Sequence, residues 1–112
     1  MNILITGGSG MVGSSFIRTI TTQHPDWTLV TPTRRQLDLS DQQAVMDFLA
    51  KSRPIDLVIH AASRVGGIKA NAGDLAGFLS DNLKISLNVI DAAYRAGVPR
   101  LVNLGSSCMD PR

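Results

Sequence analysis

Residues 6–13 of this chain read TGGSGMVG, and this stretch decides the fold. It follows an apolar run at residues 3–5 and opens into a segment with helical spacing of apolar residues. Its glycines satisfy two related spacings, G-x-G-x-x-G at Gly8, Gly10 and Gly13 and G-x-x-G-x-x-G at Gly7, Gly10 and Gly13. Such glycines let the chain turn sharply off a strand and let the backbone approach a diphosphate, while the next helix directs its free N–H groups at the phosphates. The alternative is a merely tight turn between a strand and a helix.

The preceding strand and the following helix favour a dinucleotide-binding turn over that alternative. The residues of the turn that we expect to contact the cofactor are Gly7, Gly8, Ser9, Gly10, Met11, Val12 and Gly13.

The residues after the second expected strand indicate which dinucleotide binds. NAD sites place an acidic residue there to bind the ribose 2′-hydroxyl, whereas a 2′-phosphate requires a cation. This chain has no acid at that place and has Arg34 and Arg35 instead, whose guanidinium groups suit a phosphate. We therefore expect NADP(H), with Asp38 and Leu39 at the edge of the adenine. A solvated surface would also explain the arginines, and helix-entry chemistry would explain Asp38.

Composition is typical of one globular α/β domain. The chain has 112 residues, of which 44% are hydrophobic and 18% charged. We expect no membrane segment and no secretory signal, and the single cysteine, Cys108, agrees with a cytoplasmic location. The net charge of +2 is scattered along the chain, which argues against nucleic-acid binding. His60 has no second ligand nearby in sequence, so we expect a packed core histidine and no metal site.

Strands and helices alternate along the sequence. We expect strands at residues 2–6, 27–31, 55–60 and 101–104, and helices at about 11–22, 40–53 and 74–96. Alternation of this kind predicts a Rossmann-type, three-layer, doubly wound parallel sheet in the α/β class, of which this chain supplies the first four strands and three helices.

Local signals place the helix ends. Residues 40–43 fit a capping box with Ser40 as the first cap, and the second helix presents its apolar positions Val45, Phe48 and Leu49 to the sheet. The third helix carries apolar residues at helical spacing and ends at Gly97 and Pro99; those residues are Leu79, Leu83, Ile90 and Ala93.

Five stretches together resemble the extended short-chain dehydrogenase/reductases, which include the NAD-dependent epimerases and dehydratases. They are TGGSGMVG (6–13), LDL (37–39), HAASRVGGI (60–68), DNLKISLNVIDAA (81–93) and LGSSC (104–108). VGGI together with SSC resembles the branch that converts GDP-4-keto-6-deoxymannose into GDP-L-fucose with NADPH, by epimerisation followed by reduction. The resemblance covers essentially the whole chain.

The resemblance implies roles for residues near two further strand ends. It places Ala61, Ala62, Ser63 and Leu104 along the cofactor, and it places Arg64, Val65, Gly66 and Ser107 at the GDP-sugar. Ser106 matches the catalytic serine that hydrogen-bonds the C4 oxygen of the substrate. Cys108 matches the cysteine that moves protons at C3 and C5, although a lone cysteine is more often an inert small hydrophobe.

The chain departs from the family at one catalytic element. The family's general acid is the tyrosine of a Tyr-x-x-x-Lys motif, and here the only tyrosine, Tyr94, is followed four positions later by Val98. We therefore expect residues 1–112 to be the N-terminal NAD(P)-binding portion of a longer enzyme, inactive alone, with its substrate domain elsewhere and a homodimeric parent. Two alternatives stay open: another nucleotide-sugar epimerase or dehydratase, and a non-catalytic nucleotide-binding remnant.

Overall fold

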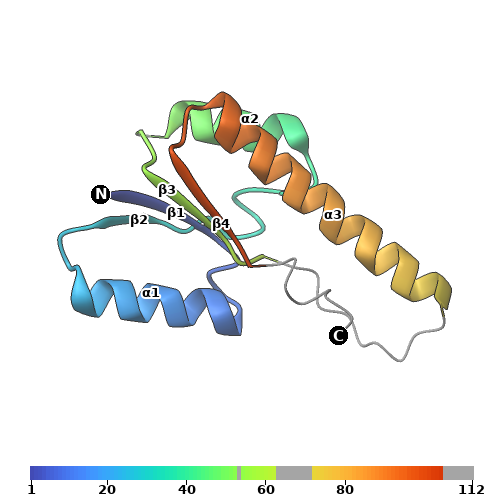
Figure 1. Ribbon diagram of the computed structural model, residues 1–112, viewed down its shortest axis with the longest axis horizontal. Helices are drawn as coiled ribbons and strands as arrows, with labels where there is room; N and C mark the ends of the chain where they lie inside the picture. Colours follow the sequence, from blue (N-terminus) through green and yellow to red (C-terminus); the bar gives the residue numbers. More distant parts are fainter. Residues whose placement is uncertain (53, 63–71, 105–112) are drawn as a thin grey trace.

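The computed structural model describes residues 1–52, 54–62 and 72–104, in which a parallel sheet carries helices on both faces (Figure 1). The elements in chain order are β1 (Asn2–Thr6), α1 (Met11–Gln23), β2 (Thr28–Val30), α2 (Gln42–Lys51), β3 (Leu57–His60), α3 (Ala72–Arg95) and β4 (Arg100–Asn103). Each expected strand and helix is present, and the bounds differ from the prediction by a few residues.

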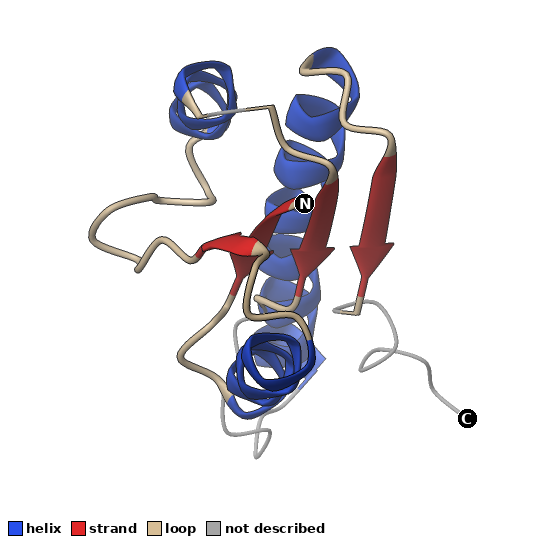
Figure 2. Ribbon diagram, turned by 90° about the vertical axis from the view of Figure 1, so that its left-hand side faces the viewer, coloured by secondary structure: helices blue, strands red, loops and turns tan. Residues whose placement is uncertain are grey.

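The strand order is β2-β1-β3-β4, and every neighbouring pair is parallel. β1 lies between β2 and β3, with Ile3 opposite Leu29 on one side and Leu57 on the other. The chain therefore moves outward from β1 to β2, returns past β1 to β3, and continues to β4. Figure 2 shows the strands side by side between the helices. This is the doubly wound parallel sheet that the sequence predicts.

The alternation of side chains along each strand divides the core between the two faces. On one face, α1 packs through Ile20 against the buried Ile3, Ile5 and Ile59 of the sheet. On the other face, α2 and α3 cover the sheet; the buried residues of that cluster are Leu4, Leu37, Val45, Leu49, Ile55, Val58, Val89, Ala92 and Ala93. Helices on both faces explain why the two central strands, β1 and β3, are almost continuously buried.

The N-cap of α2 differs from the prediction. Asp41, and not Ser40, caps the helix, because its carboxylate accepts a hydrogen bond from Ala44 N at 3.2 Å. Ser40 is engaged elsewhere: its backbone N and hydroxyl both donate to Asp38 Oδ1, at 3.0 and 2.6 Å. The helix therefore begins one residue later than the capping box indicates. The end of α3 is as predicted, since Gly97 adopts a positive φ of 76° and Val98 N donates to Ala93 O at 3.0 Å.

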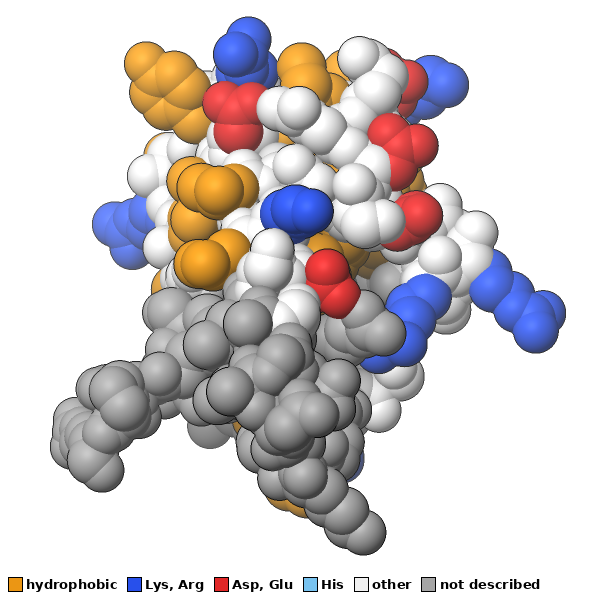
Figure 3. Space-filling view, turned by 90° about the vertical axis from the view of Figure 1, so that its right-hand side faces the viewer, with side chains coloured by type: hydrophobic (Ala, Val, Ile, Leu, Met, Phe, Trp, Pro, Cys, Tyr) orange, Lys and Arg blue, Asp and Glu red, His pale blue; other side chains and the backbone are white. Residues whose placement is uncertain are grey.

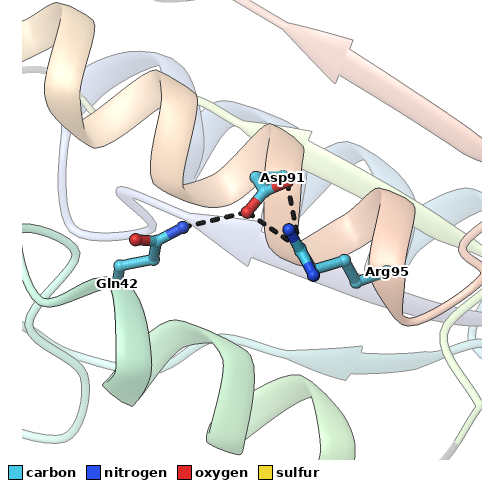
Figure 4. Close-up of polar contacts among 3 residues, drawn as sticks. All are labelled: Gln42, Asp91 and Arg95. Carbon is cyan, nitrogen blue, oxygen red and sulfur yellow. Dashed lines mark hydrogen bonds and ion pairs between the residues drawn. The ribbon is translucent and has the colours of Figure 1, made fainter.

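One polar contact joins α3 to α2 at their exposed edge, and a second lies within α3 (Figure 4). Gln42 donates to Asp91 Oδ2 at 2.9 Å, and Arg95 Nε donates to the same carboxylate at 3.1 Å. Exposed contacts of this kind contribute little to stability, so α2 and α3 are held together mainly by the buried apolar residues that they share.

α3 also leaves an apolar stripe uncovered by the described part of the chain. The stripe residues recur at helical spacing; they are Leu83 (54% exposed), Leu87 (63%), Ile90 (39%) and Tyr94 (83%). Figure 3 shows hydrophobic side chains gathered on the left of one face, with basic groups around them and acidic groups mostly on the right. Of the apolar residues that the sequence assigns to this helix, Ala93 is buried, whereas Leu83 and Ile90 are exposed.

A buried polar network joins β1, β3 and α3. His60 is fully buried, as expected for a core histidine; its Nδ1 lies 2.6 Å from Thr6 Oγ1 and its Nε2 lies 3.3 Å from Ser86 Oγ. Thr6 Oγ1 also accepts from Ala62 N at 3.3 Å. A neutral ring satisfies both contacts, since the Thr6 hydroxyl can donate to one nitrogen while the other donates to Ser86. Burial lowers the pKa of His60 from 6.5 to about 4.

We predict an acid-sensitive stability from His60. Its pKa is lower in the folded state (about 4) than its ordinary value of 6.5, so the unfolded chain binds the proton first as pH falls. This group therefore costs no stability above pH 6.5 and destabilises the fold progressively between 6.5 and 4. Urea unfolding should show a loss of about 2 kcal/mol between pH 7.5 and 5. His60→Gln should flatten that slope, and an equal slope in the variant would contradict the assignment.

Candidate functional site

A cavity of about 940 Å³ opens at the carboxyl ends of β1, β2 and β3. The residues that line it come from five segments of the chain and from α3; they are 6–13 with 17, 31–34, 37–40, 61–62, 81 with 84–85, and 104. β1 connects to β2 on one side and β3 lies on the other, so the strand order reverses here. Ligands of doubly wound sheets bind at such a reversal, beyond the carboxyl ends of the strands.

The glycine turn places backbone directly against backbone. Gly7 has a positive φ of 74°, and Gly10 N donates to Gly7 O at 3.0 Å. A Cβ on Gly13 would lie 2.0 Å from Gly7 O, and a Cβ on Gly7 would lie 2.6 Å from Ala62 N. A side chain at Gly13 would therefore push α1 away from the end of β1. A side chain at Gly7 would push the end of β1 away from the end of β3.

The first turn of α1 is open to an anion. Its N-cap, Gly10, makes no side-chain capping bond, and the first turn contains no acidic residue. The helix dipole and the first backbone N–H groups therefore face the cavity without compensation from the protein. Because Gly10, Met11, Val12 and Gly13 all line the cavity, this turn has the chemistry of a phosphate site.

A cation lies in the same cavity. Arg34 lines it, and Arg35 is not among the lining residues. Thr33 and Gln36 fix the turn that carries both arginines, since Thr33 N donates to Gln36 Oε1 at 2.9 Å and Gln36 N donates to Thr33 O at 3.0 Å. The cavity thus combines a helix N-terminus with a guanidinium group, an arrangement suited to a ligand with more than one phosphate.

Asp38 also lines the cavity and supplies a hydrogen-bond acceptor. The hydroxyl and backbone N–H of Ser40 lower the pKa of the Asp38 carboxyl below its ordinary 3.8, so it is ionised at neutral pH. Its neighbour Leu39 is fixed to α3, because Asn88 Nδ2 donates to Leu39 O at 2.9 Å. The segment 37–40 is thereby held at the cavity wall.

Most of the cofactor residues expected from the sequence lie together in this cavity. Those that line it are Gly7, Gly8, Ser9, Gly10, Met11, Val12, Gly13, Arg34, Asp38, Leu39, Ala61, Ala62 and Leu104. Outside the described residues lie Ser63, Arg64, Val65, Gly66, Ser106, Ser107 and Cys108. The roles given to these residues stay predictions.

Sequence reasoning missed the contribution of α3 to the cavity. Asp81, Lys84 and Ile85 line it at spacings of three and four residues, which places them on one side of the helix. That spacing was visible in the sequence, but nothing local shows which side of a helix faces a ligand. Among the described residues, no group of three His, Cys, Asp or Glu side chains could hold a metal ion. None of the helices in the described part is long and apolar enough to span a membrane.

Comparison with known proteins identifies the family. The family model for the NAD dependent epimerase/dehydratase family matches residues 3–112. The chain belongs to this family. Both the sheet topology and the glycine turn are those expected for the epimerase/dehydratase family from the sequence.

Two curated relatives of this chain are GDP-sugar synthases. Over 109 residues the chain is 44% identical to a GDP-L-fucose synthase of Azorhizobium caulinodans, covering 97% of this chain and 34% of the relative. It is 38% identical over 112 residues to a GDP-L-colitose synthase of Yersinia pseudotuberculosis, covering 100% of this chain and 35% of the relative. The chain therefore spans about a third of the length of these curated relatives.

A solved structure matches the fold closely. The GDP-mannoheptose C4 reductase MlghC of Campylobacter jejuni, determined with NADP bound, superimposes with a TM-score of 0.80 at 32% identity. The match covers 91% of this chain and 32% of MlghC.

The close backbone approach at Gly13 generates a paired prediction. Gly13→Ala should destabilise the fold by about 1 to 3 kcal/mol, because the new Cβ would meet a carbonyl oxygen that belongs to the rigid turn. Gly77→Ala is the matched control, since a Cβ there meets nothing within 4 Å inside α3. The control should stabilise the chain by about 0.5 to 1 kcal/mol. Chemical denaturation measures both, and a Gly13 variant as stable as wild type would show that α1 does not depend on this contact.

Proposed function

We propose that this chain is the NADP(H)-binding portion of a nucleotide-sugar epimerase-reductase that converts GDP-4-keto-6-deoxymannose into GDP-L-fucose. The observation that carries the proposal is one cavity lined by both the glycine turn and Arg34, in a chain 44% identical to a GDP-L-fucose synthase. The NADP-bound reductase of similar fold supports the choice of cofactor. In this proposal the substrate domain is not part of residues 1–112.

The residues of the cavity fit a dinucleotide phosphate. Because Gly7 and Gly13 lack a Cβ, the end of β3 and the first turn of α1 pack directly on the glycine turn. This packing holds the start of α1, which lines the cavity, in position for a diphosphate. Arg34 supplies the positive charge that a ribose 2′-phosphate requires. The first turn of α1 contains no acidic residue that would repel the diphosphate. Ala61 and Ala62 present backbone along the cavity at the end of β3.

Bound NADPH would supply a hydride for reduction of the C4 ketone. Within this chain we assign Ser106 to hydrogen-bond the C4 oxygen and Cys108 to exchange protons at C3 and C5. A proton next to a ketone is acidic enough for a thiolate to remove it, and reprotonation of the carbon on the opposite face, by a proton that exchanges with solvent, inverts the carbon. Both residues follow β4, whose end lies beside that of β3.

The similarity to a GDP-L-colitose synthase supports a second candidate. In that alternative the same cofactor portion serves an enzyme acting on a different GDP-keto-sugar. The residues that would separate the two are those assigned to the sugar, namely Arg64, Val65, Gly66 and Ser107.

The proposal includes a homodimeric parent and a cytoplasmic location. The apolar stripe of Leu83, Leu87, Ile90 and Tyr94 on α3 supports association, because exposed apolar groups at helical spacing suit helix packing. A single cysteine agrees with a reducing compartment.

Isotope exchange tests the activity and the role of Cys108 together. The full-length protein carrying this chain should oxidise NADPH with GDP-4-keto-6-deoxymannose and incorporate solvent deuterium at C3 and C5. Cys108→Ser should slow the deuterium incorporation far more than the reduction of a ketone that already has the product configuration. Unchanged incorporation in the variant would remove Cys108 from the mechanism. Absence of both reactions in wild type, with turnover of another GDP-keto-sugar, would favour the second candidate.

Cofactor selectivity tests the role of Arg34. Arg34→Ala should weaken NADPH binding about ten- to a hundredfold and leave NADH binding nearly unchanged, because only NADPH carries the 2′-phosphate. Arg35→Ala should have a smaller effect, since Arg35 is not among the lining residues of the cavity. Fluorescence titration of the reduced nicotinamides measures both affinities. Equal losses for NADPH and NADH would mean that Arg34 supports the fold and does not bind the phosphate.

A further inference from the structure

One end of the cavity is not used by the phosphate-binding groups. The glycine turn lies at one part of the cavity, and Arg34 lies after β2. The rest of the lining includes residues 61–62, residue 104, the segment 37–40 and residues 81, 84 and 85 of α3. The last two of these segments meet where Asn88 of α3 binds Leu39, and we call this part the base end of the cavity. If a dinucleotide phosphate binds as proposed, its diphosphate and 2′-phosphate are accounted for, and this end is left for the base.

α3 is docked onto this end by a specific hydrogen bond. Asn88 Nδ2 donates to Leu39 O at 2.9 Å, which holds the helix against the segment 37–40. Lys84 is one helical turn before Asn88 and therefore lies on the same side of α3. Both Lys84 and its neighbour Ile85 line the cavity. The helix thus brings a cation and an apolar side chain to the wall that faces Leu39.

Lys84 and Asp38, which line the cavity together with Asp81 and Arg34, have complementary hydrogen-bonding character. Lys84 is exposed, and the described part of the chain gives it no hydrogen bond or ion pair. Asp38 uses Oδ1 to accept two bonds from Ser40. Its other oxygen, Oδ2, remains available as an acceptor. A donor on α3 and an acceptor on the segment 37–40 therefore line the same end of the cavity.

We propose that Lys84 binds the adenine of the dinucleotide, as the donor that complements the acceptor Asp38. This inference rests on the proposed binding of NADP(H). The exposed edge of adenine carries an amino donor beside a ring-nitrogen acceptor, which matches an Asp acceptor and a Lys donor. Leu39 and Ile85 supply the apolar surfaces for the ring faces. Guanine carries a carbonyl acceptor in place of the amino group and would meet the Asp38 carboxylate unfavourably.

Comparison of two cofactors and a fragment tests this assignment. Lys84→Met keeps the length of the side chain and removes its charge. It should weaken binding of NADPH and NADH alike, by about three- to tenfold, because both carry adenine. AMP, which has the base but no 2′-phosphate, should lose potency as a competitor to the same extent. Lys51→Met is the matched control, an exposed lysine at the end of α2 outside the cavity, and should bind as wild type does.

The outcomes separate this inference from the function on which it rests. Wild-type affinity of the Lys84 variant for both cofactors, with circular dichroism showing an unchanged fold, would overturn the assignment. A loss for NADPH alone would also overturn it, because Lys84 would then act on the 2′-phosphate with Arg34. Failure of the wild-type protein to bind either cofactor would instead refute the proposed function.

Discussion

The contact between the first turn of α1 and the end of β1 is the constraint on which the rest of the structure depends. Gly13 lies so close to Gly7 that a Cβ on it would meet the Gly7 carbonyl oxygen at 2.0 Å, and a Cβ on Gly7 would meet the backbone N of Ala62 at 2.6 Å. Three segments from different parts of the sequence therefore meet without side chains between them. This close approach directs the N-terminus of α1 into the cavity and brings the end of β3 beside it. The absence of a Cβ at Gly7 and at Gly13 therefore permits both the packing and the anion site.

The polar groups below this contact are satisfied within the fold. Thr6 lies at the end of β1 and binds both His60 and Ala62 N, and His60 in turn reaches Ser86 on α3. No buried side-chain nitrogen or oxygen in the described residues lacks a hydrogen-bond partner. Because an unpaired polar group at this depth would be costly, the network requires β1, β3 and α3 to keep one relative position. The floor of the cavity is consequently rigid where a cofactor would rest.

The sequence predicted the parts of the structure that depend on local pattern. Glycine spacing, apolar strands and the stop at Gly97 each follow from residues close together, and the structure confirms the fold they imply. Ser40 shows where local pattern fails: its hydroxyl could cap α2, but Asp38 binds it, and Asp41 becomes the cap. The contribution of Lys84 and Ile85 to the cavity could not be predicted in this way, because it depends on how Asn88 docks α3 onto Leu39. The exposure of Leu83 and Ile90 has the same cause, since tertiary packing decides which side of an apolar helix is covered.

The central position of β1 has a consequence for the order in which the fold can assemble during synthesis. β1 leaves the ribosome before its partners, which are residues 28–30 on one side and 57–60 on the other. The unit of β1, α1 and β2 is closed by the shorter loop and can form first, which presents the glycine turn early. Residues 61–62 and α3, which also line the cavity, are synthesised later. A nascent chain therefore has a phosphate-binding helix end well before it has a closed cavity.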